Sequence, residues 1–135
     1  YSEFSNINGD ALDFSGSDVS IGKTKANNVK DKAVSAGEKS ILNIEDSHFN
    51  NVGVGVASKD GSLVTMTSTA ISNYELYAAM AYIKKDFYGS PIINVNNCSV
   101  SNDNAYIRQK GTTMIVDNIK ISESEINVEK LYQLE

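Results

Sequence analysis

Short segments in which apolar and polar residues alternate recur along the whole chain. The alternation has the two-residue period of a β-strand, and each segment is too short and too rich in β-branched residues for a helix. Clusters of Gly, Asn, Asp and Ser separate the segments, as is typical of turns. The clearest set consists of five apolar pairs: Val19 and Ile21, Leu42 and Ile44, Val64 and Met66, Ile93 and Val95, and Met114 and Val116. The chain is therefore predicted to consist of repeated β-segments.

The repeats share one irregular spacing. The second members of these pairs lie 23, 22, 29 and 21 residues apart, and a second apolar column repeats that series: Ala26, Phe49, Ile71, Val100 and Ile121. A third column steps by 22, 22, 24 and 26 residues: Leu12, Val34, Val56, Met80 and Tyr106. Three strands in each turn of about 22 residues, stacked in parallel, describe a β-solenoid. We therefore predict an all-β fold, a right-handed parallel β-helix of about five coils with three strands each, forming a single domain over residues 1–133.

Asparagine recurs two residues beyond the second column, where each coil would turn a corner. If Phe4 begins that column, the set is Asn6, Asn28, Asn51, Asn73 and Asn102. A tight corner needs a residue that tolerates a positive φ, and Asn does so better than other non-glycine residues. Stacked amides can also form hydrogen bonds along the solenoid axis. We therefore predict an asparagine ladder at one corner.

The two ends of the chain carry separate predictions. Residues 4–8 match the third strand of a coil, so we expect the chain to be a fragment of a longer β-helix. Residues 126–128 fit the first strand of another coil, and residues 129–133 fit a short helix that would cover strand edges. Residues 134–135 resemble a cloning remnant. Residues 74–85 also have helical spacing, although the column register favours a strand there.

Two segments carry a resemblance to a known family. The segments DKAVSAGEKS at residues 31–40 and GVGVASKDGS at residues 53–62 resemble coils of the pectate-lyase-like β-helix superfamily, and most closely β-helix segments of bacterial surface or secreted proteins. The resemblance covers about residues 4–122. Enzymes of that superfamily are polysaccharide lyases, hydrolases and epimerases, often with Asp or Glu holding calcium and an Arg or Lys as base. No such constellation stands out in this sequence, so the resemblance does not imply an activity.

Charge and composition argue against several classes of function for this chain. With 12 Lys and Arg against 17 Asp and Glu, the formal net charge is −5, which disfavours nucleic acid or anionic lipid as the main partner. No apolar run approaches the roughly 18 residues that are needed to cross a bilayer, so membrane insertion is not expected. Cys98 is the only cysteine, which excludes an internal disulfide and a multi-cysteine metal site.

Small residues dominate one predicted outward face of the first strand in each coil. They include Ala33, Gly55, Ala57, Ala79 and Ala81. Covering a flat, rigid face of small residues costs little side-chain entropy. We therefore predict that this face is an interface with the remainder of a larger protein or with a second copy of the chain, as a homodimer. A flat floor for a polysaccharide chain is the alternative.

Coil four carries an insertion of about five residues, which falls within residues 83–91. Insertions in solenoids form loops on one face, often the binding face. Lysines at the same turn of neighbouring coils would form a ridge beside two aromatic rings: Lys59, Lys84, Lys85 and Lys110, with Phe87 and Tyr88. Such a ridge would stack on sugar rings and pair with the carboxylates or sulfates of an acidic polysaccharide. The alternative is a solvated turn with weak surface ion pairs.

Residue types that support catalysis are sparse. His48 is the only histidine and Arg108 the only arginine, and their positions fit surface and turn roles better than the positioned acid or base that catalysis needs. The alternation places Cys98 on the inward side of its strand, which favours a thiol packed in the core over a reactive one. Three aspartates could gather near one edge and hold calcium: Asp10, Asp13 and Asp31. Their spacing alone is weak evidence, so we predict no catalytic residue, no metal and no cofactor.

These observations lead to one functional expectation and one alternative. We expect a non-catalytic β-helix segment of a larger bacterial extracellular or cell-envelope protein, with a structural, glycan-binding or protein-binding role. The alternative is a fragment of a polysaccharide lyase or epimerase whose other site residues lie upstream.

Overall fold

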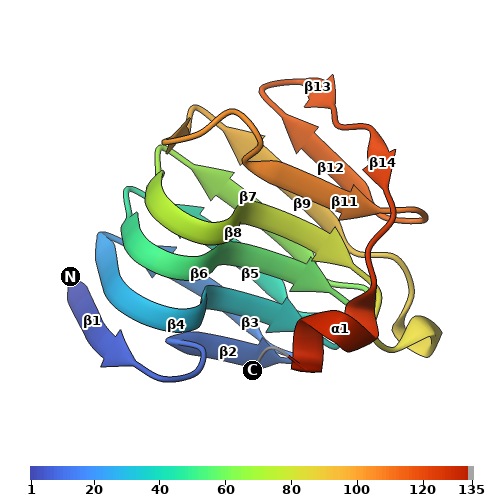
Figure 1. Ribbon diagram of the computed structural model, residues 1–135, viewed down its shortest axis with the longest axis horizontal. Coiled ribbons are helices and arrows are strands. Elements are labelled where there is room, and N and C mark those ends of the chain that lie inside the picture. The colour runs from blue at the N-terminus through green and yellow to red at the C-terminus, as the bar shows by residue number, and fades with distance from the viewer. Residues whose placement is uncertain (134–135) are drawn as a thin grey trace.

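Two sheets of mainly parallel strands run along the axis of a β-solenoid of about five turns (Figure 1). The computed structural model of the protein describes residues 1–133, so the predicted cloning remnant at residues 134–135 lies outside the described residues. The six-stranded sheet contains β3 (Asp18–Gly22), β5 (Ile41–Glu45), β7 (Leu63–Thr67), β9 (Ile92–Asn96), β12 (Thr113–Val116) and β13 (Ile119–Lys120). The eight-stranded sheet contains β1 (Ser2–Ile7), β2 (Leu12–Ser15), β4 (Thr24–Gly37), β6 (His48–Lys59), β8 (Ala70–Tyr82), β10 (Ser99–Val100), β11 (Tyr106–Gln109) and β14 (Glu123–Ser124). The predicted fold class is confirmed.

The central coils each contribute one straight strand and one long, bent strand. The bent strands β4, β6 and β8 contain 14, 12 and 13 residues, and their curvature is visible in Figure 1. Each bends at an asparagine, Asn28, Asn51 or Asn73, whose φ lies between 53° and 56°. Two of the three predicted strands of a coil are therefore joined into one ribbon. The alternative of a helix over residues 74–85 is wrong, because β8 occupies most of that stretch.

The strand register confirms two of the three predicted apolar columns over most of their length. Ile21, Ile44, Met66, Val95 and Val116 are successive partners in the six-stranded sheet. The second column pairs from Phe4 to Val100, and Ile121 lies beyond the paired strands. In the third column, Val56 pairs with Ala79 and not with Met80, which pairs with Ala57. The shift arises from a bulge near Val54, where β8 has one residue more than β6.

The asparagine ladder forms over four of its five predicted members. Asn6, Asn28, Asn51 and Asn73 all have positive φ. The Nδ2 of Asn28 donates to Asn6 Oδ1 (3.2 Å), and the Nδ2 of Asn51 donates to Asn28 Oδ1. Asn73 reaches the neighbouring Asn50 Oδ1 instead (2.8 Å). Asn102 departs from the pattern, because it lies in an irregular segment where its backbone N–H donates to the Tyr74 hydroxyl (2.8 Å).

A second ladder, of side-chain hydroxyls, runs along the corner that joins the two sheets. The backbone N–H of Thr24 donates to Ser47 Oγ (3.2 Å), and the backbone N–H of Ser47 donates to Thr69 Oγ1 (3.4 Å). Each hydroxyl in turn donates to the carbonyl two residues earlier, as Ser47 does to Glu45 O (2.8 Å). The hydroxyls therefore satisfy buried backbone groups that strand pairing leaves without partners.

The C-terminal segment folds back onto the outward face of the eight-stranded sheet. Helix α1 (Val128–Gln133) belongs to a second apolar cluster, in which four buried residues are covered by six partly buried ones, four of them from the C-terminal segment. The buried four are Val54, Ala57, Met80 and Tyr82, and those of the C-terminal segment are Ile126, Val128, Leu131 and Tyr132. The predicted strand over residues 126–128 is therefore wrong, and the short helix covers a sheet face rather than strand edges (Figure 1). No helix in residues 1–133 is long and apolar enough to cross a membrane.

The hydroxyl ladder can be tested at Ser47. Ser47→Ala removes the acceptor of the Thr24 N–H, a buried donor, and should lower the free energy of unfolding by about 1–3 kcal/mol. Ser47→Thr is the matched control, because Thr occupies the equivalent positions 24 and 69, and it should keep most of the stability. Urea unfolding followed by circular dichroism measures both. Equal losses in the two variants would contradict the role of the hydroxyl.

Candidate functional site

The insertion in coil four forms a loop that the preceding coil holds in place. Asp60 is buried, and its Oδ1 accepts hydrogen bonds from the backbone N–H groups of Lys84 and Lys85, both at 2.7 Å. The short 3-10 helix η1 (Asp86–Tyr88) follows directly. A buried carboxylate that accepts two backbone donors fixes the start of the loop, because breaking either bond would leave a polar group unsatisfied.

Other coils add further anchors to the loop. From the following coil, Gln109 Oε1 accepts the backbone N–H of Ile83 (2.7 Å). From two coils earlier, Glu38 Oε2 accepts the hydroxyl of Tyr88 (3.0 Å). Gly61 lies directly beneath the loop, where an added Cβ would collide with the carbonyl oxygen of Tyr88. The loop is therefore a rigid extension of the solenoid.

The anchored loop presents an exposed aromatic pair. Phe87 is 76% exposed, and its ring lies 4.5 Å from the ring of Tyr88, centroid to centroid. Single exposed apolar side chains are common on protein surfaces. Phe87 differs from such isolated side chains. Hydrogen bonds fix its neighbour Tyr88 and the two residues that precede η1, so the exposed ring stands on a support that is already ordered.

The predicted lysine ridge is divided among three places. Lys85 Nζ pairs with Glu38 Oε1 at 3.5 Å, and Lys84 Nζ lies 3.9 Å from the ring centroid of Tyr132 in α1. Lys59 also turns to Tyr132, where its Nζ donates to the phenol oxygen (3.2 Å). Lys110 is exposed and belongs to a separate groove beside residues 124–127. Of the four predicted lysines, only Lys85 therefore has its ammonium group beside the aromatic pair, where it shares Glu38 with Tyr88.

Tyr132 is the centre of a cationic cluster that the sequence analysis missed. Lys32, Lys59 and Lys84 place their Nζ atoms 5.3, 5.6 and 3.9 Å from its ring centroid, within the range of cation–π attraction. Burial, with the nearby charge of Lys32, lowers the pKa of Lys59 below its ordinary value. The cluster holds α1 against the sheet, and no periodicity in residues 126–133 could have indicated it.

The predicted small-residue interface is buried within the chain itself. Ala33, Ala79 and Ala81 belong to the central core. Gly55 also faces inward, because an added Cβ would lie 2.8 Å from Ile71 Cγ2. Ala57 points outward but lies in the cluster covered by α1. The expectation that these residues form an exposed flat face is therefore corrected: the bulge near Val54 changes the phase of the strand, and α1 occupies the outward side.

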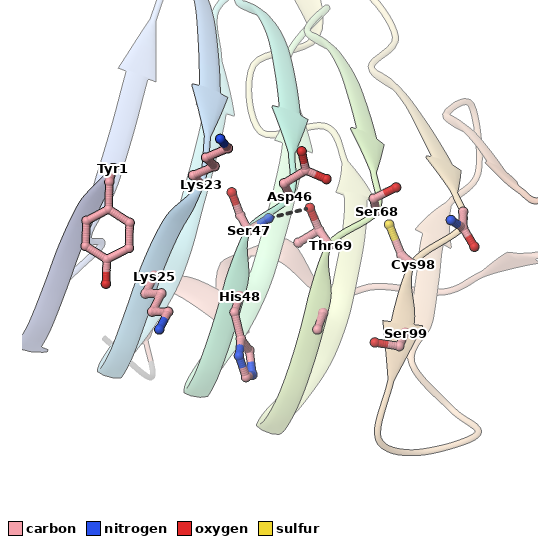
Figure 2. A pocket seen from close by; sticks show the side chains of 12 residues that line it. Tyr1, Lys23, Lys25, Asp46, Ser47, His48, Ser68, Thr69, Cys98 and Ser99 are labelled. Carbon is pink, nitrogen blue, oxygen red and sulfur yellow. Dashed lines mark hydrogen bonds between the residues drawn. The ribbon is translucent and has the colours of Figure 1, made fainter.

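A groove crosses the coils at the corner beside the hydroxyl ladder (Figure 2). His48 lines it, and its Nε2 lies 3.3 Å from Ser72 Oγ. Cys98 continues the hydroxyl ladder, with its thiol donating to Asn96 O at 3.4 Å. Burial raises the pKa of the Cys98 thiol. Cys98 is partly buried and packs against the central core, in agreement with its predicted inward position. The remaining side chains of the groove are mainly Lys23, Lys25, Asp46 and short polar residues.

The other candidates from the sequence have structural partners. Arg108 donates through Nε to Ile121 O and through Nη1 to Thr112 O (2.9 Å), which fixes the last coil. Asp10 and Asp31 both lie beside Lys32, at 4.0 and 3.1 Å from its Nζ. Among residues 1–133, no group of three or more His, Cys, Asp or Glu side chains is arranged to hold a metal ion.

Comparisons of the chain with protein-family models, curated proteins and solved structures gave no match. The structure confirms the β-helix that the resemblance implied, while membership in the pectate-lyase-like superfamily stays a prediction.

The role of Asp60 can be tested with two variants. Asp60 has a φ of 53°, so Asp60→Gly removes the carboxylate without backbone strain, and Asp60→Asn retains an oxygen acceptor in a residue that tolerates this conformation. Asp60→Gly should expose the backbone amides of Lys84 and Lys85 to faster hydrogen exchange, while Asp60→Asn should change it much less. Unchanged exchange in Asp60→Gly would show that the loop does not depend on this anchor.

The Glu38 anchor should depend on pH. The hydrogen bond from Tyr88, with further help from Ser15 and Lys85, lowers the pKa of Glu38 below its ordinary 4.5, and Glu38 raises the pKa of Tyr88. A carboxylate with a lowered folded-state pKa stabilises the fold above its unfolded pKa, and this contribution is lost as the pH falls through the folded value. The ring signals of Phe87 and Tyr88 in NMR spectra should therefore be constant near neutral pH and shift only as the pH falls below the ordinary value of 4.5. Glu38→Gln should lack this transition, and an identical transition in that variant would contradict the assignment.

Proposed function

We propose that the protein is a non-catalytic β-solenoid module that binds a glycan at the loop of residues 83–91. The observation that carries the proposal is the exposed Phe87 ring, held against Tyr88 on a loop that residues of three other coils anchor. An aromatic face contributes large contact area at low entropic cost when its support is already rigid. Pyranose rings present apolar C–H faces that such a ring can cover.

The charge around the loop supports an acidic glycan. Lys39 is exposed and lies at the same corner, since its Cγ would be 3.1 Å from a Cβ added to Gly61. Glu38, whose carboxylate accepts the Tyr88 hydroxyl, already pairs with Lys85. Uronate or sulfate groups would therefore meet ammonium groups beside the aromatic pair, despite the net charge of −5.

The test is a glycan array followed by titration of the best ligand. Phe87→Ala should weaken binding about 2- to 13-fold, the effect of losing roughly 0.5–1.5 kcal/mol of aromatic contact. Phe87→Tyr is the matched control, because it keeps the ring and should bind nearly as well. Binding should also weaken as salt is raised, since exposed charges are screened.

Three results would contradict the proposal. The first is that the wild-type protein binds no uronate or sulfated glycan on the array, and the second is that the Phe87→Ala variant binds them equally well. The third is release of an unsaturated product from a polyuronate, which would favour the alternative of a lyase fragment.

A further inference from the structure

Exposed apolar side chains gather at one corner of the solenoid. In the part of the chain that the structure describes, six large hydrophobic side chains are exposed: Tyr1, Ile41, Leu76, Phe87, Ile92 and Ile119. Three of them, Ile41, Phe87 and Ile92, lie where the loop of residues 83–91 meets the six-stranded sheet. Single apolar residues are ordinary on a protein surface, whereas a contiguous group of them indicates a binding site.

Ile41 and Ile92 belong to one row on the outward face of the six-stranded sheet. The strand register aligns Ile41 with Leu63 and Leu63 with Ile92, at the first outward position of β5, β7 and β9. This row of three residues, the aliphatic stripe, ends at polar register partners, Asp18 in β3 and Thr113 in β12. The stripe belongs to the central coils, and each of its three strands is paired on both sides.

The aliphatic stripe continues from the aromatic pair. The loop passes directly over Gly61, where an added Cβ would collide with the carbonyl oxygen of Tyr88. Leu63 follows Gly61 by two residues, and Ile92 follows Tyr88 by four. Two residues of a strand span only about 7 Å, so the aromatic pair and the stripe form one surface.

The shape of this surface favours a linear ligand. The stripe is one side chain wide, and the next outward row consists of short polar residues that are also in register: Asn43, Thr65 and Asn94. Because adjacent strands lie about 4.8 Å apart, each coil presents one apolar group beside one amide or hydroxyl at a regular interval along the axis. A chain of sugars likewise repeats an apolar C–H face beside hydroxyl groups. A globular protein partner would need a broader surface, of about 800 Å² on each side.

The charges beside the stripe fit an acidic chain of limited length. The six residues of the two central rows are uncharged. The exposed Lys39 lies at the corner beside Gly61, where it can meet the acid groups of a ligand. Asp18 closes the stripe at β3, where its carboxylate would repel an acidic chain. The stripe therefore takes a stretch of a few sugars that spans β9, β7 and β5.

We propose that the glycan-binding site extends from Phe87 along the aliphatic stripe, so that its ligand is an extended acidic polysaccharide that lies parallel to the solenoid axis. This inference rests on the proposed function, and it adds that the site recognises several consecutive sugars of a polymer. The C–H faces of the sugars cover Ile92, Leu63 and Ile41 in turn, and their hydroxyl groups meet the polar row beside the stripe.

The test is a titration with uronate or sulfated oligomers, whichever the glycan array selects, from a disaccharide to an octasaccharide. Affinity should rise with chain length until the oligomer spans the stripe and should then level off. Leu63→Thr removes the central aliphatic side chain but keeps a residue suited to a strand. It should weaken binding of the long oligomers about fourfold or more, the effect of losing at least one covered methylene, and leave disaccharide binding unchanged.

Leu76→Thr is the matched control for the titration. Leu76 is also an exposed leucine, but it lies in β8 of the eight-stranded sheet, so its replacement should leave the gain with chain length intact. Equal losses in the two variants would show that the effect of Leu63→Thr is not specific to the stripe, which would overturn the inference.

Methyl signals in NMR spectra of the wild-type protein give a second readout that needs no variant. The long oligomers should shift the signals of Ile41, Leu63 and Ile92. The signals of Leu76 and Ile119, which are exposed elsewhere, should stay in place. A disaccharide should leave the signal of Ile41, at the far end of the stripe, unchanged.

The outcomes separate this inference from the proposed function. If oligomers bind and Phe87→Ala weakens their binding, but affinity does not depend on chain length or Leu63→Thr retains the gain, the extended site is wrong and the proposed function stands. If no oligomer binds, both are wrong. Shifts of the stripe signals that depend only on protein concentration would also overturn the inference, because a second copy of the chain would then cover the stripe.

Discussion

The left-handed corner residue is the constraint on which the structure depends. A coil can close only if the backbone reverses direction sharply, and it does so at residues with positive φ: Asn28, Asn51 and Asn73 at one corner, and Asp46 and Ser68 at another. This conformation costs an L-residue about 1–2 kcal/mol. The cost is offset only when coils stack, because pairing with the next coil supplies backbone hydrogen bonds on both sides of the corner and the amide and hydroxyl ladders at the corner itself. Stability therefore belongs to the stack and not to any single coil.

Because stacking repeats the same corner, the sequence reveals most of the fold. Two apolar columns with one shared spacing predict the strand register correctly, and the recurring asparagines predict the corner. The third column fails by one residue at Met80. The stretch from Tyr77 to Tyr82 is apolar or small at every position, so it contains no alternation that could place a bulge. Register was predictable wherever polar residues mark the outward face, and not where both faces are covered.

The candidate site also combines a feature that the sequence pattern reveals with contacts between residues that lie far apart in the sequence. The insertion of coil four could be located from column spacing alone, because the inserted residues interrupt a regular series. The residues that anchor the loop could not be located in this way, because Glu38 and Asp60 lie in earlier coils and look like ordinary turn residues in the sequence. The alignment of turns predicted the lysine ridge. Lys59 and Lys84 instead contact Tyr132, which lies more than 40 residues later in the sequence and reaches them because the C-terminal segment folds back onto the sheet.

Glu38 connects the loop with the coils that precede it. It lies at the corner after β4, where Tyr88 of the loop and Ser15 at the end of β2 both form hydrogen bonds to its side chain. Asp60, which accepts the backbone N–H groups at the start of the loop, belongs to another earlier coil. The position of the aromatic pair therefore depends on the stacking of several coils and not on the inserted residues alone, since its anchors come together only when the coils stack.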